Sequence, residues 1–189
     1  MKKFALLLLV MTLAGCAGTL PDKADLIVET ANQSAKVYPA SIEVSVVGRD
    51  KRTDPHVIVY KDDKEPALTL TSRLPLQMMV AESLAQGLRE QGLNRGDRSN
   101  ITVAVVVKEV QAKVTKPGAL YSSKARTRLD VVVSNNGSVL TLEYNREASK
   151  ESMTRPKVLF LETMLNDQLS DIVTKILEDS RLREAIKGK

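Results

Sequence analysis

The sequence predicts a single α+β domain, built from a mostly antiparallel sheet of about five strands with two main helices packed on one face. Its 189 residues are 43% apolar, which is enough for one domain with its own hydrophobic core. Two long segments repeat apolar residues at helical spacing, and several shorter ones alternate apolar and polar residues as strands do. We expect this domain to span residues 41–189, after a leader at 1–15 and a tether at 16–40.

The amino terminus has the parts of a secretory signal. Two lysines follow Met1, residues 4–13 are almost wholly apolar, and small residues come next. The apolar run is about half of the roughly 20 residues that a membrane-spanning helix needs, so export is favoured over a transmembrane anchor. The signal ends in Leu13-Ala14-Gly15-Cys16, which resembles the lipobox of bacterial lipoproteins.

The lipobox predicts that residues 1–15 are removed and that Cys16, the chain's only cysteine, carries acyl chains. The alternative is an ordinary signal with a chance cysteine. Acyl chains would make the membrane a partner, because each buried methylene contributes about 0.8 kcal/mol. Ala17 follows in place of the aspartate that tends to retain enteric lipoproteins in the inner membrane, so the resemblance implies the periplasmic face of the outer membrane.

The charge balance argues against a nucleic-acid partner. Loss of the two leader lysines lowers the formal net charge from +5 to +3, and no long basic stripe stands out. Residues 16–40 mix glycine, proline and polar residues, a composition typical of a flexible tether. The apolar residues 26–28 could instead dock as a short edge strand.

Alternating and valine-rich segments predict the first strands. The earliest closes at Gly48, and the longest changes its apolar face near Lys108, which indicates a bulge or burial of half the strand on both faces. These strands are expected at residues 41–47, 57–60, 67–71 and 101–114.

The helices are predicted from apolar residues that recur every fourth position. The first spans 74–91, with Pro75 in its first turn and Gly92 in the left-handed position just past its end. The second spans 157–178, and a short last turn follows at 182–186.

A hairpin is predicted around Asn136-Gly137, because these residues favour a two-residue loop with left-handed backbone. Such a loop fixes which residues of the two strands face each other. The apolar pairs on one face are then Val133 with Leu140, Val131 with Leu142, and Leu129 with Tyr144.

The other face of this hairpin carries the basic residues Lys124, Arg126 and Arg128. In the same register Arg126 lies opposite Glu147, and Arg128 reaches Glu143 diagonally. The basic residues are therefore interpreted as a solvated sheet face with cross-strand charge pairs. The alternative is a binding patch for an anionic lipid or glycan.

The densest polar segment is the loop after the first strand, with Asp50, Arg52, Thr53 and Asp54. Aspartates in turns accept hydrogen bonds from backbone amides, and an arginine can bridge carboxylates with its fork of donors. The loop is interpreted as a self-satisfied surface turn. The alternative is a recognition loop for a protein partner in the cell envelope.

The sequence does not predict an enzyme, a cofactor or a metal site. His56 is the only histidine, and no Gly-x-Ser-x-Gly elbow supplies a nucleophile for it. Metal ligands at workable spacing are absent from the sequence, and the only thiol is assigned to the lipid. A hydrolase built on paired carboxylates stays open as a minor alternative, since such pairs leave no local signature, but only 3% of the residues are aromatic.

Four features in order resemble the YajG-like family of bacterial lipoproteins. They are the lipobox at Cys16, the loop Asp50-Lys51-Arg52-Thr53-Asp54, the segment Leu68-Thr69-Leu70-Thr71-Ser72-Arg73 that runs into a helix ending near Gly92, and the closing amphipathic helix. That family is uncharacterised, so the resemblance implies a location and an α+β domain but no catalytic residues.

These observations lead to one main functional hypothesis and two alternatives. The main one is a non-enzymatic outer-membrane lipoprotein that binds another envelope component through the loop or the exposed sheet face. The second is a lipid- or lipopolysaccharide-binding protein that uses a groove between helices and sheet, or the basic face. The third is the carboxylate hydrolase. The partner's identity and the oligomeric state stay open.

Overall fold

A computed structural model describes residues 21–30, 35–62, 65–96 and 99–188. These residues form eight strands and three helices. The strands are β1 (Lys23–Ala24), β2 (Glu43–Asp50), β3 (His56–Asp62), β4 (Glu65–Ser72), β5 (Asn94–Arg95), β6 (Ile101–Thr115), β7 (Tyr121–Asn135) and β8 (Ser138–Ser152). The helices are α1 (Leu76–Glu90), α2 (Val158–Glu178) and α3 (Ser180–Lys187).

The α+β domain is confirmed, but the predicted sheet of about five mostly antiparallel strands is wrong. The sheet is mixed: β7 pairs antiparallel with β6 and β8, whereas β2 and β3 both run parallel to β6. β6 has 15 residues, so β2 pairs with its first half and β3 with its second half. Parallel pairing of β2 and β3 with β6 is possible because α1, between β4 and β6, returns the chain to the end of the sheet where β2 begins.

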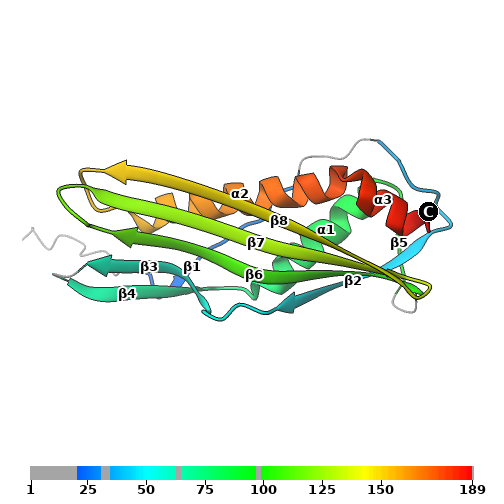
Figure 1. The fold of residues 1–189 in the computed structure, drawn as a ribbon, viewed down its shortest axis with the longest axis horizontal. Helices are drawn as coiled ribbons and strands as arrows, with labels where there is room; N and C mark the ends of the chain where they lie inside the picture. Colours follow the sequence, from blue (N-terminus) through cyan, green and yellow to red (C-terminus); the bar gives the residue numbers. More distant parts are fainter. Residues whose placement is uncertain (1–20, 31–34, 63–64, 97–98, 189) are drawn as a thin grey trace, which may run out of the picture.

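All three helices lie together along one side of this sheet, as predicted for the two main ones (Figure 1). Alternate residues of β7 are buried beneath them, which gives that strand one buried and one more exposed face. The stripe of α2 that faces the sheet is fully buried, and it consists of Leu161, Leu165, Leu169, Ile172, Val173, Ile176 and Leu177.

The predicted hairpin register is confirmed. Asn136 and Gly137 have φ of 47° and 89°, the left-handed values that the two-residue loop needs. Val133 pairs with Leu140 and Arg126 with Glu147, as that loop requires. The change of face near Lys108 is also explained, because the pairing of β6 with β7 shifts between Val107 and Glu109.

Gly48 does not close the first strand, which continues to Asp50. A Cβ atom at this position would lie 1.9 Å from the carbonyl oxygen of Gln77 in α1. The glycine therefore lets the helix backbone approach the strand, a role that glycine can have inside a strand as well as at its end.

The segment at residues 21–30 packs on the folded body over part of the stretch that the sequence assigned to a tether. Its backbone amides at Asp25, Ile27 and Glu29 donate to side chains of α2 at 2.7, 3.0 and 3.0 Å. The strand in this segment is β1, which pairs with β4. It ends at Ala24, two residues before the apolar residues 26–28 that could have formed the edge strand. The predicted leader at residues 1–15 and the predicted lipidation site Cys16 lie outside the described residues. Within the described part, no helix is long and apolar enough to span a membrane.

Candidate binding face

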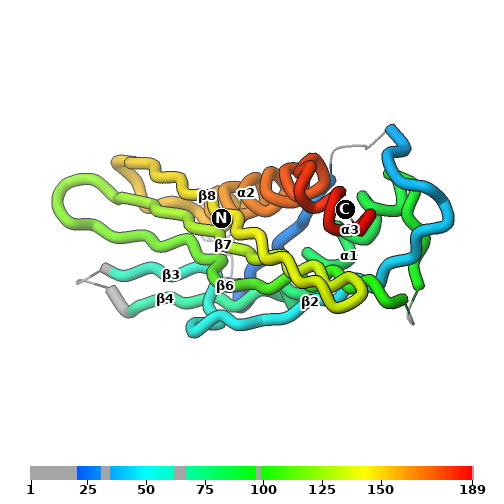
Figure 2. Tube along the Cα trace, turned by 45° about the vertical axis from the view of Figure 1, so that its right-hand side comes forward, coloured from blue at the N-terminus to red at the C-terminus, as the bar shows by residue number. Residues whose placement is uncertain are grey.

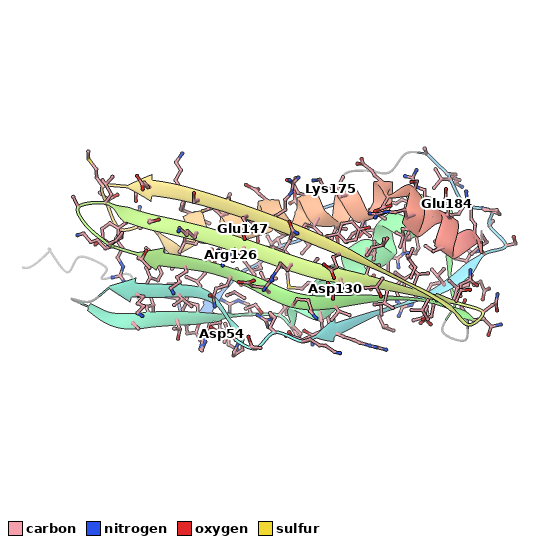
Figure 3. All side chains as sticks on the ribbon, in the orientation of Figure 1. Asp54, Arg126, Asp130, Glu147, Lys175 and Glu184 are labelled. Atoms are coloured by element: carbon pink, nitrogen blue, oxygen red, sulfur yellow. The ribbon has the colours of Figure 1, made fainter. Side chains whose placement is uncertain are left out.

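The three basic residues Lys124, Arg126 and Arg128 project from β7 on the side of the sheet away from the helices, and all are exposed. Arg126 Nε lies 3.1 Å from Glu147 Oε1 on β8, the predicted pair (Figure 3). Arg128 differs from the prediction, because its ion pair is with Glu109 on β6 in place of Glu143: Arg128 Nη2 lies 2.8 Å from Glu109 Oε2. The bulge in β6 explains this, because it places Glu109 directly opposite Arg128.

The loop that follows β2 is held by Arg52. The Arg52 side chain is only 8% exposed, and its guanidinium donates to both carboxylate oxygens of Asp50 and to the carbonyl of Pro55. These hydrogen bonds lower the pKa of Asp50 below its usual range. Arg52 and Asp50 therefore shape the loop, whereas Thr53 at its crest is exposed.

Asp54 connects this loop to the sheet. One carboxylate oxygen accepts from the backbone amide of His56 at 2.9 Å and lies 2.7 Å from the His56 ring. The other accepts from Gln111 Nε2 on β6 at 2.9 Å. The backbone hydrogen bond from His56 is the main cause that lowers the pKa of Asp54. Asp54 is thus a charged hydrogen-bond acceptor that fastens the loop beside β6.

Gln111 joins the two candidate sites into one surface. It pairs in register with Arg126 across the strands β6 and β7, and its amide also donates to the carbonyl of His56 at 3.1 Å. Sequence reasoning missed Gln111, because its contact with Asp54 depends on the parallel pairing of β3 with β6. The only available signal was its position on the exposed side of β6, past the bulge.

We call the joined surface the outer charged face. Shallow hollows of about 180 and 270 Å³ follow each other along it, the first beside the loop and Arg128, the second beside Lys124 and Arg126. Positive and negative side chains alternate along this face. A further ion pair joins Lys108 to Asp130 at 3.5 Å. The face consists of Asp50, Arg52, Thr53, Asp54, Lys108, Glu109, Gln111, Lys113, Lys124, Arg126, Arg128, Asp130 and Glu147.

A larger hollow of about 520 Å³ lies between the β7–β8 turn and α3. Asn135, Val139, Arg181 and Glu184 are among the residues that line it. None of the residues predicted as sites lies there. In the part of the chain that the structure describes, no group of three or more His, Cys, Asp and Glu side chains is placed to hold a metal ion.

Comparison with known proteins identifies the family. The model of a family described as "Uncharacterized lipoprotein" matches residues 29–187. The chain belongs to this family. It is also 23% identical over 147 residues to the uncharacterised lipoprotein YajG of Escherichia coli O6:H1, a match that covers 77% of this chain and 76% of that protein. The resemblance inferred from the sequence is therefore confirmed.

Solved structures share the fold of this lipoprotein family member. Protein XCC0632 from Xanthomonas campestris superposes with a TM-score of 0.53 at 11% identity, over 83% of this chain and 93% of that one. A second structure, of an uncharacterised protein, gives 0.50 at 11% identity, over 84% and 98%. Membership of a lipoprotein family implies membrane anchoring through acyl chains and a place in the cell envelope.

Proposed function

We propose that the protein is a non-enzymatic lipoprotein of the outer membrane, held on the periplasmic face by acyl chains on Cys16, and that its outer charged face binds a protein of the envelope. The observation that carries this proposal is that the loop after β2 lies beside the basic residues of β7. Gln111 on β6 joins the two, because its amide donates to Asp54 and to the carbonyl of His56. A face of alternating charge suits a protein partner with the complementary pattern, because charge complementarity selects partners and fixes their register.

In-cell photocrosslinking tests this proposal with the intact, lipidated chain. A photoreactive residue at Thr53 or Arg126 is expected to form a discrete adduct with one envelope protein. The matched control is Lys175, which is exposed on α2, on the other side of the sheet (Figure 3). Free monomer from all three positions, or an adduct from Lys175 alone, would contradict the assignment of the outer charged face.

A second candidate is binding of an anionic lipid or lipopolysaccharide by one part of the same face. Lys113 and Lys124 lie directly opposite each other on β6 and β7, and both line the hollow of about 270 Å³. Like charges in that arrangement repel each other, and a bound phosphate would relieve the repulsion. The other alternative, a groove between helices and sheet, is disfavoured because fully buried side chains such as Leu165 and Leu169 fill that interface.

Capture on immobilised lipopolysaccharide separates the two candidates. If the anion site is real, the double variant K113S/K124S loses retention, whereas K175S, with its substitution on the helical side, is retained like the natural protein. Equal retention of all three proteins would remove the anion site and leave the protein-binding proposal in place.

A further inference from the structure

One end of the long molecule exposes apolar side chains from three different segments. The β6–β7 connection, the end of β8 and the start of α2 meet at this end, opposite the end with the β7–β8 turn and α3 (Figures 1 and 2). We call it the tip surface. It comprises the apolar residues Leu120, Met153, Leu159 and Phe160 and the lysines Lys116, Lys150 and Lys157.

The apolar residues of the tip surface are exposed and do not belong to the hydrophobic core. Met153 is 85% exposed and Leu159 is 72% exposed, and Leu120 and Phe160 are also exposed. Tyr121 and Ser152 form the last pair of the β7–β8 ladder, so Leu120 and Met153 are the next residue beyond it on each strand. Clustered exposed apolar side chains mark a surface that another phase or molecule covers.

The charges around these residues are mostly positive. Residues 116–120 and 150–160 together contain four basic side chains and one acidic side chain, Glu151. Lys116, Lys150 and Lys157 are exposed, and none of them forms an ion pair with a carboxylate of the described residues. Residues 61–65, which join β3 to β4, contain two lysines and three carboxylates, a formal charge of −1 that is smaller than the +3 of the two tip segments. Apolar side chains flanked by lysines suit the interface of an anionic bilayer.

The direction of β1 leads the chain back toward the same end. β1 runs parallel to β4, with Lys23 paired to Thr71, so the chain enters β1 from the direction of the β3–β4 connection. That connection lies about 20 Å farther along β4, and the seven residues from Cys16 to Lys23 span at most about 25 Å. The opposite end is out of reach, because Lys23 is level with about Val110 of β6 through Thr71 and His56, so the start of β6 at Ile101 lies about 30 Å away.

We propose that the tip surface rests on the bilayer that holds the chain's own acyl anchor. Leu120, Met153, Leu159 and Phe160 enter the headgroup boundary, and the lysines contact anionic headgroups. The long axis then stands away from the membrane, which holds the β7–β8 turn about 50 Å from it. The proposal rests on the acylation of Cys16 in the proposed function, but not on what the outer charged face binds.

The experiment measures the depth of single fluorophores in the lipidated, full-length mature protein. Cys16 is the only natural cysteine and its sulfur is blocked by the lipid, so a new cysteine in M153C, L159C or V139C can be labelled alone. Each protein is reconstituted in vesicles of phosphatidylethanolamine and phosphatidylglycerol that contain a spin-labelled quenching lipid. We expect blue-shifted, quenched emission from positions 153 and 159 and water-like, unquenched emission from position 139, beside the β7–β8 turn.

Flotation of the same vesicles tells the possible failures apart. Floated protein with water-like emission at 153 and 159, or with quenching at 139 instead, would overturn the membrane-facing tip while the anchor stands. Protein that fails to float would overturn the acyl anchor of the proposed function and this inference with it. Quenching confined to 153 and 159 on floated vesicles supports both.

Discussion

Thr127 and Gln168 form a buried polar link between β7 and α2. The Thr127 hydroxyl donates to Gln168 Oε1 at 2.8 Å, and Gln168 Nε2 donates to the carbonyl of Ala125 at 3.2 Å. Both side chains are buried, and each has its hydrogen-bond partners there. Such a link fixes how α2 is seated on the sheet, because a shifted helix would leave buried polar atoms without partners.

The variant T127V is expected to lower the free energy of unfolding by about 1–3 kcal/mol, because it keeps the shape of the side chain but leaves Gln168 Oε1 buried without a donor. Urea denaturation measures the loss. T127S keeps the hydroxyl and serves as the control. If T127V unfolds at the same urea concentration as T127S, the hydrogen bond has no net role in stability.

α1 and α2 approach each other at Gly87. A Cβ atom there would lie 2.3 Å from Leu177 Cδ1. We expect G87A to cost about 1–3 kcal/mol of stability, although alanine favours a helix over glycine by about 1 kcal/mol. The matched control is G118A, where nothing lies within 4 Å of the added atom, and it should change stability by less than about 0.5 kcal/mol. Thermal unfolding of both variants checks this, and a stabilised G87A would show that the helices are farther apart.

Asp179 caps α3 and ties it to the sheet. Its carboxylate accepts from the backbone amide of Arg181 at 2.9 Å, from the Arg181 guanidinium, and from the Tyr144 hydroxyl on β8 at 2.8 Å. The Arg181 side chain is the main cause that lowers the pKa of Asp179 from 3.8 to about 2, and the Tyr144 hydroxyl adds to it. The ionised carboxylate is therefore favoured in the folded protein.

Because the folded pKa of Asp179 lies below the unfolded one, its contribution is complete above about pH 4 and is lost as the pH falls toward 2. A shift from 3.8 to about 2 corresponds to about 2 kcal/mol. D179N is expected to be less stable than the natural protein by that order at pH 6, with the difference shrinking between pH 4 and pH 2. Denaturation series at several pH values measure it. A difference that does not depend on pH would show that the charge of Asp179 is irrelevant.

Elements that pair with a sequence neighbour were predictable, and those that pair across the chain were not. Asn136 and Gly137 fix the β7–β8 register locally, so the sequence alone predicts the Arg126–Glu147 pair. The contact between Gln111 and Asp54 joins residues 57 positions apart through parallel pairing, which no local pattern specifies. The strand part of the outer charged face was therefore predictable, and its contact with the loop after β2 was not.

At the scale of the whole molecule, the amino-terminal segment decides how far the folded body can lie from its proposed membrane anchor. Three backbone amides of residues 25–29 donate to α2 side chains spaced four residues apart, Glu162, Asn166 and Ser170. That spacing places the three acceptors on one face of the helix. The spacing is present in the sequence of α2, but the composition of residues 16–40, from which the tether was predicted, does not reveal it. Since β1 joins the sheet at Lys23, only the six residues between Cys16 and Lys23 separate the sheet from the proposed membrane anchor.

Leu26 distinguishes a docked segment from a free tether. It is 6% exposed and packs on the core, whereas its neighbour Ile27 is 57% exposed. If the segment is docked, L26A removes buried apolar contacts and lowers the unfolding free energy by about 2 kcal/mol or more, while I27A changes it by less than about 0.5 kcal/mol. Chemical denaturation of both variants in the lipidated protein measures this. Equal stability of L26A and I27A would mean that residues 21–30 leave the body in solution, and the molecule would then stand farther from the membrane than the tip surface requires.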